Sequence, residues 1–440
     1  MLRKLLLLLL FVGINSYGQF NESAPWMGNI KKNPSNTSKA NPSSYTINEI
    51  SEAFQEYWKD KDPNVKGSGF KPYMRWENYW KNFVDSQGNL PTSTELWETW
   101  KNKSNSTAKS NAISNWSSLG PFSTNAYSGR LPGQGRVNAV AVDPNNPNTW
   151  YVGAPAGGSW KSINAGSSWI NLFDDFPQIG VSGIAIDPNN SNIIYIATGD
   201  DDAADSYSVG VFKSLDGGNT WNATGLNPSN TSIGWLMNEI TIDPTNSQIV
   251  WVGTNQGLYK SNDAGINWVR TKTGNIKDFK LKPNNSNTIY AVSNNEFFKS
   301  TDGGATFITI TNNLPTSSGR FVLGVTPANE NVVYILSANT GANDFSFQGI
   351  YKSINSGQTF TKRANTTNIM ESNQAWFDLA LEVSPTDENV LYTGCLNLWK
   401  SNNGGNAFQK LNSWFQNNPA YTHADIHTLK IFNGKLFCGS

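Results

Sequence analysis

Short apolar segments alternate with polar turns along most of the chain, and the alternation repeats. From residue 120 onward, an apolar segment that ends in proline, such as 240–244, precedes two more apolar segments, such as 249–253 and 257–261, and then a turn. Runs of about four to eight residues bounded by Gly, Asn, Asp and Ser are typical of β-strands. With the strand that leaves the turn, the pattern predicts a unit of four short antiparallel strands.

One turn motif, Ser-x-Asp-x-Gly-x-x-Trp, marks each of these units. Ser214, Asp216, Gly218 and Trp221 form a complete copy, and relaxed copies use Asn for Asp or Phe for Trp. The Asp or Asn is expected to accept hydrogen bonds within its own turn, and the Gly to take a positive φ. These residues are explained by turn geometry and carry no catalytic role. The six Asp-box positions with this structural role are Asn164, Asp216, Asp263, Asp302, Asn355 and Asn403.

The six copies recur at intervals close to the length of a propeller blade. They begin at residues 162, 214, 261, 300, 353 and 401. One unit of this size cannot bury its apolar face alone, so the units are expected to stack around an axis. The sequence therefore predicts an all-β, multi-bladed Asp-box β-propeller with six recognisable blades and a partial seventh. Residues 429–440 open that seventh unit without a box, which favours truncation at the C-terminus, because a half-built blade leaves strand edges unpaired.

A helical pattern precedes the strands. Thr46 and Glu49 are spaced as a capping box, and an aromatic stripe with helical spacing begins at Phe54. Similar stripes follow in 76–80 and 92–100, so three short amphipathic helices are expected. Such stripes either bind sugar rings or pack, against each other or against the propeller flank, and packing is the favoured interpretation.

The N-terminal residues have the features of a signal peptide. A basic pair precedes an apolar run over 5–12 and small residues follow, so cleavage is expected before Gln19. No later stretch approaches the roughly 20 apolar residues of a transmembrane helix. We therefore expect a protein that is secreted or held at the outer cell surface. The expected segments are a signal peptide at 1–18, a helical leader region at 19–101, a linker at 102–115 and the propeller at 116–440.

Charge and cysteine content exclude some classes of function. The 33 Lys and Arg residues equal the 33 Asp and Glu residues, so no net field attracts nucleic acid, and a nucleic-acid partner is not expected. The only two cysteines, Cys395 and Cys438, allow one disulfide but no disulfide scaffold.

The six boxes resemble those of the BNR or Asp-box superfamily, which includes sialidases, sortilin-type domains and xyloglucanase-like glycoside hydrolases. The resemblance covers roughly 116–440. Residues 118–121, 135–144 and 158–162 look like the sortilin-like propellers of secreted bacterial surface proteins, which often end in a sorting module for type IX secretion. No such module is visible here. The resemblance implies a scaffold that binds a carbohydrate or peptide partner.

The alternative function is a glycan-active hydrolase of the xyloglucanase-like type. Hydrolysis of this kind uses two carboxyl groups that flank the scissile bond, and Asp425 is the candidate catalytic residue, with no second acid identified. The relatives carry an acid ahead of a Gly-Gly pair in their first blade, whereas Pro155 stands at that place before Gly157 and Gly158. A sialidase is disfavoured, because no arginine cluster for a carboxylate can be assembled.

An acidic run interrupts the second blade between its second and third strands. Carboxylates suit Ca²⁺ or sugar hydroxyls, but Ca²⁺ takes about six to eight oxygen ligands and this loop supplies only some of them. A solvated acidic loop is the favoured interpretation, and a ligand or Ca²⁺ site is the alternative. The candidate ligand-binding residues are Asp200, Asp202, Asp205 and Tyr207.

The only two histidines of the chain flank a carboxylate. In an extended segment, positions i, i+2 and i+4 share a side, so His423, Asp425 and His427 are expected to converge near the propeller axis, with Asp378 from the neighbouring blade. The three could bind a divalent transition metal such as zinc, or act as acid and base near neutral pH. Hydrogen bonding at a blade junction is the favoured structural alternative.

Overall fold

The computed structural model describes residues 26–27, 45–64, 69–91, 93–105, 135–173, 176, 180–202, 206, 208–228, 235–341, 344–414 and 420–440. The chain divides into two compact units, residues 1–92 and 93–440. The predicted signal peptide and residues 106–115 of the predicted linker lie outside the described residues. Within the described ranges, no helix is both long and apolar enough to cross a membrane.

Two helices form the first unit, α1 (Ile47–Trp58) and α2 (Phe70–Trp80). The predicted capping box begins α1, because the Glu49 amide donates to Thr46 Oγ1 and the Thr46 amide donates to Glu49 Oε2 at 2.7 Å. Phe54 and Tyr73 stack with their ring centroids 3.8 Å apart, and Trp26 meets both rings edge-on. The aromatic stripes of these two helices therefore build the core of this unit.

The third helix, α3 (Ser93–Asn105), belongs to the second unit. Trp97 is buried against Phe212 of the second blade and against Phe173, which follows the last strand of the first blade. The predicted leader region joined all three helices in 19–101. The structure instead places the boundary before α3, because Trp97 packs on the propeller, and α3 extends four residues into the predicted linker.

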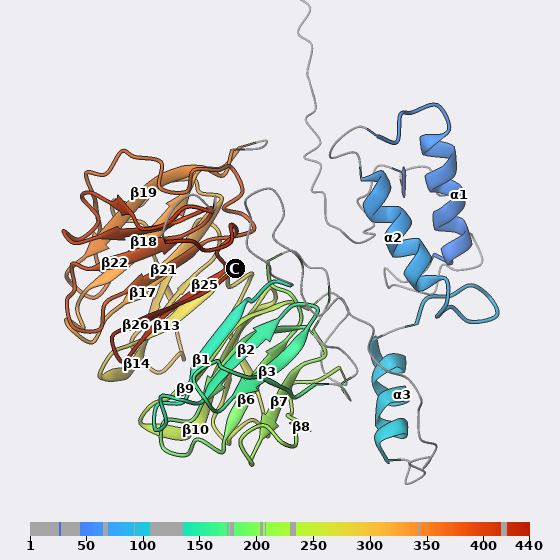
Figure 1. Ribbon diagram of the computed structural model, residues 1–440, viewed down its shortest axis with the longest axis horizontal. Coiled ribbons are helices and arrows are strands. Elements are labelled where there is room, and N and C mark those ends of the chain that lie inside the picture. The colour runs from blue at the N-terminus through green and yellow to red at the C-terminus, as the bar shows by residue number, and fades with distance from the viewer. Residues whose placement is uncertain are drawn as a thin grey trace, which may run out of the picture. The chain divides into compact units, whose positions relative to one another are not determined.

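Six four-stranded antiparallel sheets form the blades, each with its strands in sequence order (Figure 1). Blade 1 consists of β1 (Ala139–Val142), β2 (Trp150–Ala154), β3 (Gly158–Ser162) and β4 (Ile170–Asn171). Blade 2 consists of β5 (Val181–Ile186), β6 (Ile194–Thr198), β7 (Val211–Ser214) and β8 (Asn222–Ala223). Blade 3 consists of β9 (Met237–Asp243), β10 (Asn246–Thr254), β11 (Gly257–Ser261) and β12 (Val269–Thr273).

The second half of the propeller repeats this order. Blade 4 consists of β13 (Asp278–Lys282), β14 (Asn285–Val292), β15 (Phe297–Ser300) and β16 (Ile308–Ile310). Blade 5 consists of β17 (Arg320–Val325), β18 (Val333–Ala338), β19 (Phe347–Ser353) and β20 (Thr361–Lys362). Blade 6 consists of β21 (Ala380–Val383), β22 (Leu391–Gly394), β23 (Leu398–Ser401) and β24 (Gln409–Lys410). The predicted all-β propeller with six recognisable blades is confirmed.

The partial seventh unit is a two-stranded sheet of β25 (Thr428–Phe432) and β26 (Lys435–Gly439). It lies between blade 6 and blade 1. The Ile431 amide donates to Glu382 Oε1 of β21 at 3.0 Å, and the Val137 amide donates to the Ser440 carbonyl at 3.2 Å. The hairpin is therefore hydrogen-bonded to blade 6 through the Glu382 side chain and to the segment before β1 through the backbone.

Each Asp-box lies on the turn between the third and fourth strands, as predicted. In blade 2, the Thr220 amide donates to Asp216 Oδ1 at 2.8 Å, and the Gly218 amide donates to Ser214 Oγ at 2.8 Å. Gly218 has φ 92°, where any other residue is strained. Trp221 then returns to the aromatic core of the second blade. The box residues are engaged in their own turns, in agreement with a structural role.

A hydrogen-bonded joint, repeated in the sequence, connects neighbouring blades. The carbonyl of Gly217, in the box of blade 2, accepts from Tyr151 Oη at 3.0 Å and Lys161 Nζ at 2.7 Å, both in blade 1. The carbonyl of Ala264, in the box of blade 3, accepts in the same way from Tyr195 and Lys213 of blade 2. We call this arrangement the box joint.

Candidate functional site

The first strands of the sheets line a central channel with a cavity of about 460 Å³. Its wall carries buried charge. Lys280 Nζ donates to Asp278 Oδ1 at 2.7 Å and to Glu239 Oε2 at 2.5 Å. Burial and the nearby Glu239, opposed by Lys280, raise the pKa of Asp278 to about 7. The channel is therefore a polar interior rather than an apolar core.

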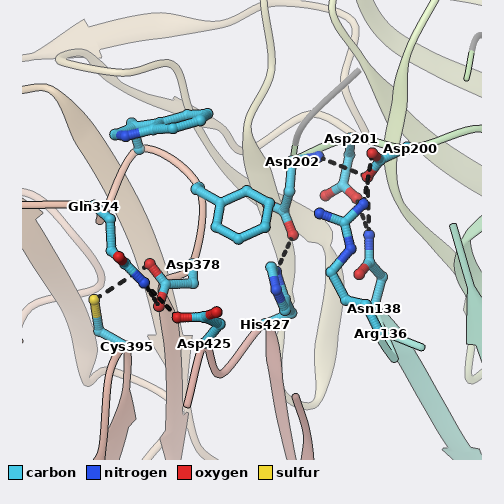
Figure 2. Close-up of polar contacts among 12 residues, drawn as sticks. Arg136, Asn138, Asp200, Asp201, Asp202, Gln374, Asp378, Cys395, Asp425 and His427 are labelled. Carbon is cyan, nitrogen blue, oxygen red and sulfur yellow. Dashed lines mark hydrogen bonds and ion pairs between the residues drawn. The ribbon is translucent and has the colours of Figure 1, made fainter. Parts of the chain in front are cut away.

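The acidic loop between β6 and β7 crosses the end of this channel where the first strands begin. Asp202 Oδ1 accepts from Arg320 Nη2 at 3.0 Å. Asp202 Oδ2 lies 2.7 Å from His427 Nδ1, as Figure 2 shows. Arg320 begins β17 in blade 5, and His427 directly precedes β25. The Asp202 carboxylate of blade 2 therefore connects blade 5 with the segment before β25. It also links the acidic loop to the histidine motif, which the sequence analysis treated as two separate candidate sites.

Two carboxylates of this loop, Asp200 and Asp202, have buried side chains that pair with cations. Asp200 is fully buried and accepts from Arg136 Nη2 at 2.6 Å and Asn138 Nδ2 at 3.1 Å. Burial alone raises the pKa of Asp202, but Arg320 and His427 beside it hold that pKa well below its usual range. The favoured interpretation of a solvated loop is therefore wrong for Asp200 and Asp202, because both are withdrawn from water by their ion pairs.

Two of the loop candidates, Asp205 and Tyr207, lie outside the described residues. Among the residues that are described, no group of three His, Cys, Asp or Glu side chains is arranged to hold a metal ion. The Ca²⁺ alternative finds no ligand set there, because Arg136 and Arg320 already occupy the carboxylates of Asp200 and Asp202.

The histidine motif is not extended. Asp425 has φ 66°, in the left-handed region, so the alternation of sides is broken between the two histidines. His423 is exposed, and its Nδ1 lies 3.0 Å from the carbonyl of Ala424, whereas His427 is buried and contacts Asp202. The expected shared face of His423, Asp425 and His427 is therefore wrong.

Asp378 does meet Asp425, as expected. Gln374 Nε2 donates to Asp378 Oδ2 at 3.1 Å and to Asp425 Oδ1 at 2.5 Å (Figure 2). Burial, with a contribution from Asp425, raises the pKa of Asp378 to about 7. The Cys395 thiol donates to Asp378 Oδ1 at 3.5 Å, and burial raises the pKa of this thiol. Both Cys395 and Cys438 are free.

A turn before β21 presents an aromatic side chain beside these carboxylates. Arg320 Nη1 donates to the carbonyls of Trp376 at 3.2 Å and Phe377 at 3.1 Å. The Phe377 ring meets the His427 ring edge-on at 4.7 Å, and the Arg136 guanidinium lies 5.0 Å from its centroid. Trp376 remains 43% exposed. Sequence reasoning assigned no role to Arg320, Trp376 or Phe377, and the one signal was an arginine at the start of an innermost strand.

No protein-family model matches this sequence, and no curated protein matches it. Solved structures do match in fold. The GH74 xyloglucanase from Xanthomonas campestris has 15% sequence identity and a TM-score of 0.54, and the match covers 70% of this chain and 51% of the xyloglucanase. The structure of YCF48 bound to D1 peptide has 15% identity and a TM-score of 0.50, and the match covers 70% and 90% of the two chains.

A third similar structure is the extracellular domain of BT4673 from B. thetaiotaomicron. It has 14% identity and a TM-score of 0.51, and the match covers 70% of this chain and 37% of the other. This chain thus spans about half the length of the xyloglucanase. At these identities the likeness establishes the fold: the chain is a β-propeller of the Asp-box type, related in architecture to these three proteins.

Proposed function

We propose that this protein is a secreted or cell-surface binding propeller that holds a carbohydrate on the surface around Trp376. The signal-peptide pattern of residues 1–18 supports export. The observation that carries the proposal is the exposed indole of Trp376. The turn that bears it is held by the buried Arg320 guanidinium, which donates to the carbonyls of Trp376 and Phe377. An indole whose backbone is already held in place can contact a partner at little cost in ordering.

The chemistry around Trp376 suits sugar rings. An aromatic face offers apolar area at little cost in conformational entropy, and adjacent amides and carboxylates read hydroxyl groups. Gln374, two positions before Trp376, supplies an amide, and Asp425, which accepts a hydrogen bond from Gln374, supplies a carboxylate. Both residues are only partly buried. Xyloglucan is the first probe, since one similar fold belongs to a xyloglucanase.

The hydrolase alternative has one observation in its favour. Asp378, with a pKa of about 7, is suited to hold a proton near neutral pH, and Asp425 lies beside it. However, Asp378 has no exposed surface, and one Gln374 amide bridges both carboxyl groups. An acid with no exposed surface cannot reach a glycosidic oxygen, so the geometry favours binding without turnover.

Calorimetric titration with xyloglucan and cello-oligosaccharides tests the proposal. The Trp376→Ala variant should bind at least tenfold more weakly, about 1.4 kcal/mol, because it loses the stacking face. Trp169→Ala is the matched control, since Trp169 is 37% exposed but lies in the Asp-box turn of blade 1, and its affinity should be unchanged. Equal affinity of both variants would contradict the proposed surface.

A reducing-end assay and titrations with peptides distinguish the other functions. Release of reducing ends that is lost in Asp425→Asn would establish the hydrolase. Saturable binding of peptides with no binding of glycans would replace carbohydrate by peptide as the ligand class. Absence of saturable binding for every glycan and peptide at millimolar concentration would refute a binding role for this surface.

A further inference from the structure

Two carboxyl groups share one amide donor at the turn that carries Trp376. Gln374 Nε2 donates to Asp378 Oδ2 at 3.1 Å and to Asp425 Oδ1 at 2.5 Å (Figure 2). Asp378 has no exposed surface, and its other oxygen accepts from the Cys395 thiol at 3.5 Å. Both of these donors to Asp378 are uncharged, so neither offsets a negative charge on its carboxyl group.

A carboxyl pair of this kind favours a bound proton. Two neighbouring carboxyl groups cannot both ionise without strong repulsion, and burial removes the water that would screen it. Burial, reinforced by Asp425 and opposed in part by the Gln374 hydrogen bond, raises the pKa of Asp378 to about 7. Geometry and electrostatics therefore agree that the pair holds a proton in mildly acidic solution.

Three other titratable or charged groups lie around Asp378, namely His427, Arg320 and Cys395. His427 and Arg320 both contact Asp202, at 2.7 Å and 3.0 Å. Burial raises the pKa of the Cys395 thiol, which therefore stays neutral. The two basic side chains thus compensate Asp202 first, and a proton offsets the charge of the carboxyl pair.

The Gln374 amide links two separate segments of the chain. The Gln374 carbonyl closes its own turn, because it accepts from the Phe377 amide at 2.8 Å and from the Asp378 amide at 3.3 Å. The segment of Asp425 is anchored elsewhere, since the Ile426 amide donates to a main-chain carbonyl of blade 6 at 2.7 Å. The turn and the segment before β25 are therefore joined through the side chains of the carboxyl pair.

We propose that Asp378 and Asp425 share one proton, and that this proton keeps the turn of residues 374–378, here called the latch turn, closed against the segment before β25. When the proton leaves to solvent, two carboxylates face one amide, and opening of the latch turn relieves their repulsion. The device goes beyond carbohydrate binding at Trp376, because every group in it belongs to the protein. It can therefore be tested without a ligand.

The direction of the pH dependence follows from proton linkage. In the closed turn the pKa of Asp378 is about 7. In an open turn its pKa should return to the ordinary value of about 3.9. Opening therefore releases a proton, and it becomes easier by about tenfold per pH unit between these two values. Above about pH 7 neither state holds the proton, so opening no longer depends on pH.

Hydrogen–deuterium exchange of the full chain, read by mass spectrometry from about pH 5 to pH 9, measures this opening. Protection factors divide out the intrinsic pH dependence of exchange. They are compared for the Phe377 and Asp378 amides and for the fully buried strand β18. In the wild type, protection of the latch turn should fall about tenfold per unit from pH 5 to pH 7 and then stay level. Strand β18 should be protected more strongly at every pH.

Three variants assign the effect to the carboxyl pair. Asp378→Asn keeps the shape of the side chain but cannot ionise, so protection of its latch turn should not depend on pH. Asp387→Asn is the matched control, because Asp387 is an exposed aspartate of blade 6 that accepts within its own turn, and the wild-type pH dependence should remain. In Asp425→Asn the level region should begin at a lower pH, because the second carboxyl no longer opposes ionisation.

The wild type alone can overturn the proposal, so the test survives a variant that fails to fold. Constant protection of the latch turn between pH 5 and pH 7 would exclude a proton that holds it closed. Equal protection of the latch turn and strand β18 at every pH would show global unfolding instead of a local opening. An unchanged pH dependence in Asp378→Asn would assign the effect to His427, and an unchanged one in Asp425→Asn would exclude a shared proton.

Discussion

Replacement of Asp202 by asparagine tests the ion pairs that cross the channel. The side chains of Asp202 and Arg320 are 4% and 10% exposed, so the substitution leaves a buried guanidinium without its counter-charge. Breaking a buried pair from one side costs about 3 to 5 kcal/mol of unfolding free energy. Arg320 keeps its two carbonyl partners and asparagine can still accept a hydrogen bond, so we expect about 3 kcal/mol.

Urea unfolding followed by fluorescence of the 17 tryptophans gives the measurement. Asp344→Asn is the control, because Asp344 is exposed and hydrogen-bonded only within its own loop, and its midpoint should not move. In the double variant Asp202→Asn, Arg320→Met, the loss should be smaller than the sum of the single losses, since no charge is left unpaired. An Asp202→Asn midpoint equal to that of the wild type would refute the reasoning.

The depressed pKa of Asp202 also sets a pH dependence. Its folded pKa lies below the unfolded value of about 3.9, so the stabilisation is complete above that pH and is lost as the pH falls through the folded pKa. The variant should therefore be less sensitive to acid than the wild type.

Two further predictions concern packing and burial. Gly225→Ala should lower the unfolding free energy by about 1 to 3 kcal/mol in urea, because a Cβ there would lie 2.0 Å from the Ile266 carbonyl, whereas Gly341→Ala, with its nearest atom at 3.5 Å, should be neutral. Asp378 has a folded pKa of about 7 against about 3.9 unfolded, so its contribution to stability falls as pH rises between these values and is flat above them. Asp378→Asn should remove that fall in urea midpoints measured across the range, and an unchanged pH profile would show that the carboxyl is ionised in the fold.

The fold could be predicted because its signals are local. A box such as Ser214 to Trp221 makes its hydrogen bonds within a few residues, so the motif fixes the turn wherever it occurs. The stacking of blades then follows, because each unit exposes an apolar face. The unit to which α3 belongs has no local signal, because Trp97 is buried by Phe212, more than a hundred residues away in the chain.

The candidate site depended on pairings that no local pattern reveals. Asp202 and His427 are 225 positions apart, and sequence reasoning placed them in two separate candidate sites. The shared histidine face failed on a single dihedral angle, since Asp425 adopts the left-handed conformation that aspartate tolerates better than most residues. The neighbours of Asp378 were predicted better, because adjacent blades necessarily bring β21 and the segment before β25 together.

The box joint bears on how such a chain can evolve. Its acceptor is a main-chain carbonyl, which every amino acid supplies, and the acceptor residue is Gly217 in one blade and Ala264 in the next. The donors, a tyrosine and a lysine, belong to the preceding repeat. A duplicated or recombined repeat therefore carries its own donors and its own box carbonyl. Its donors can bond to the box carbonyl of whichever repeat follows it. Blade number can change by whole repeats while the side chains of the neighbours diverge.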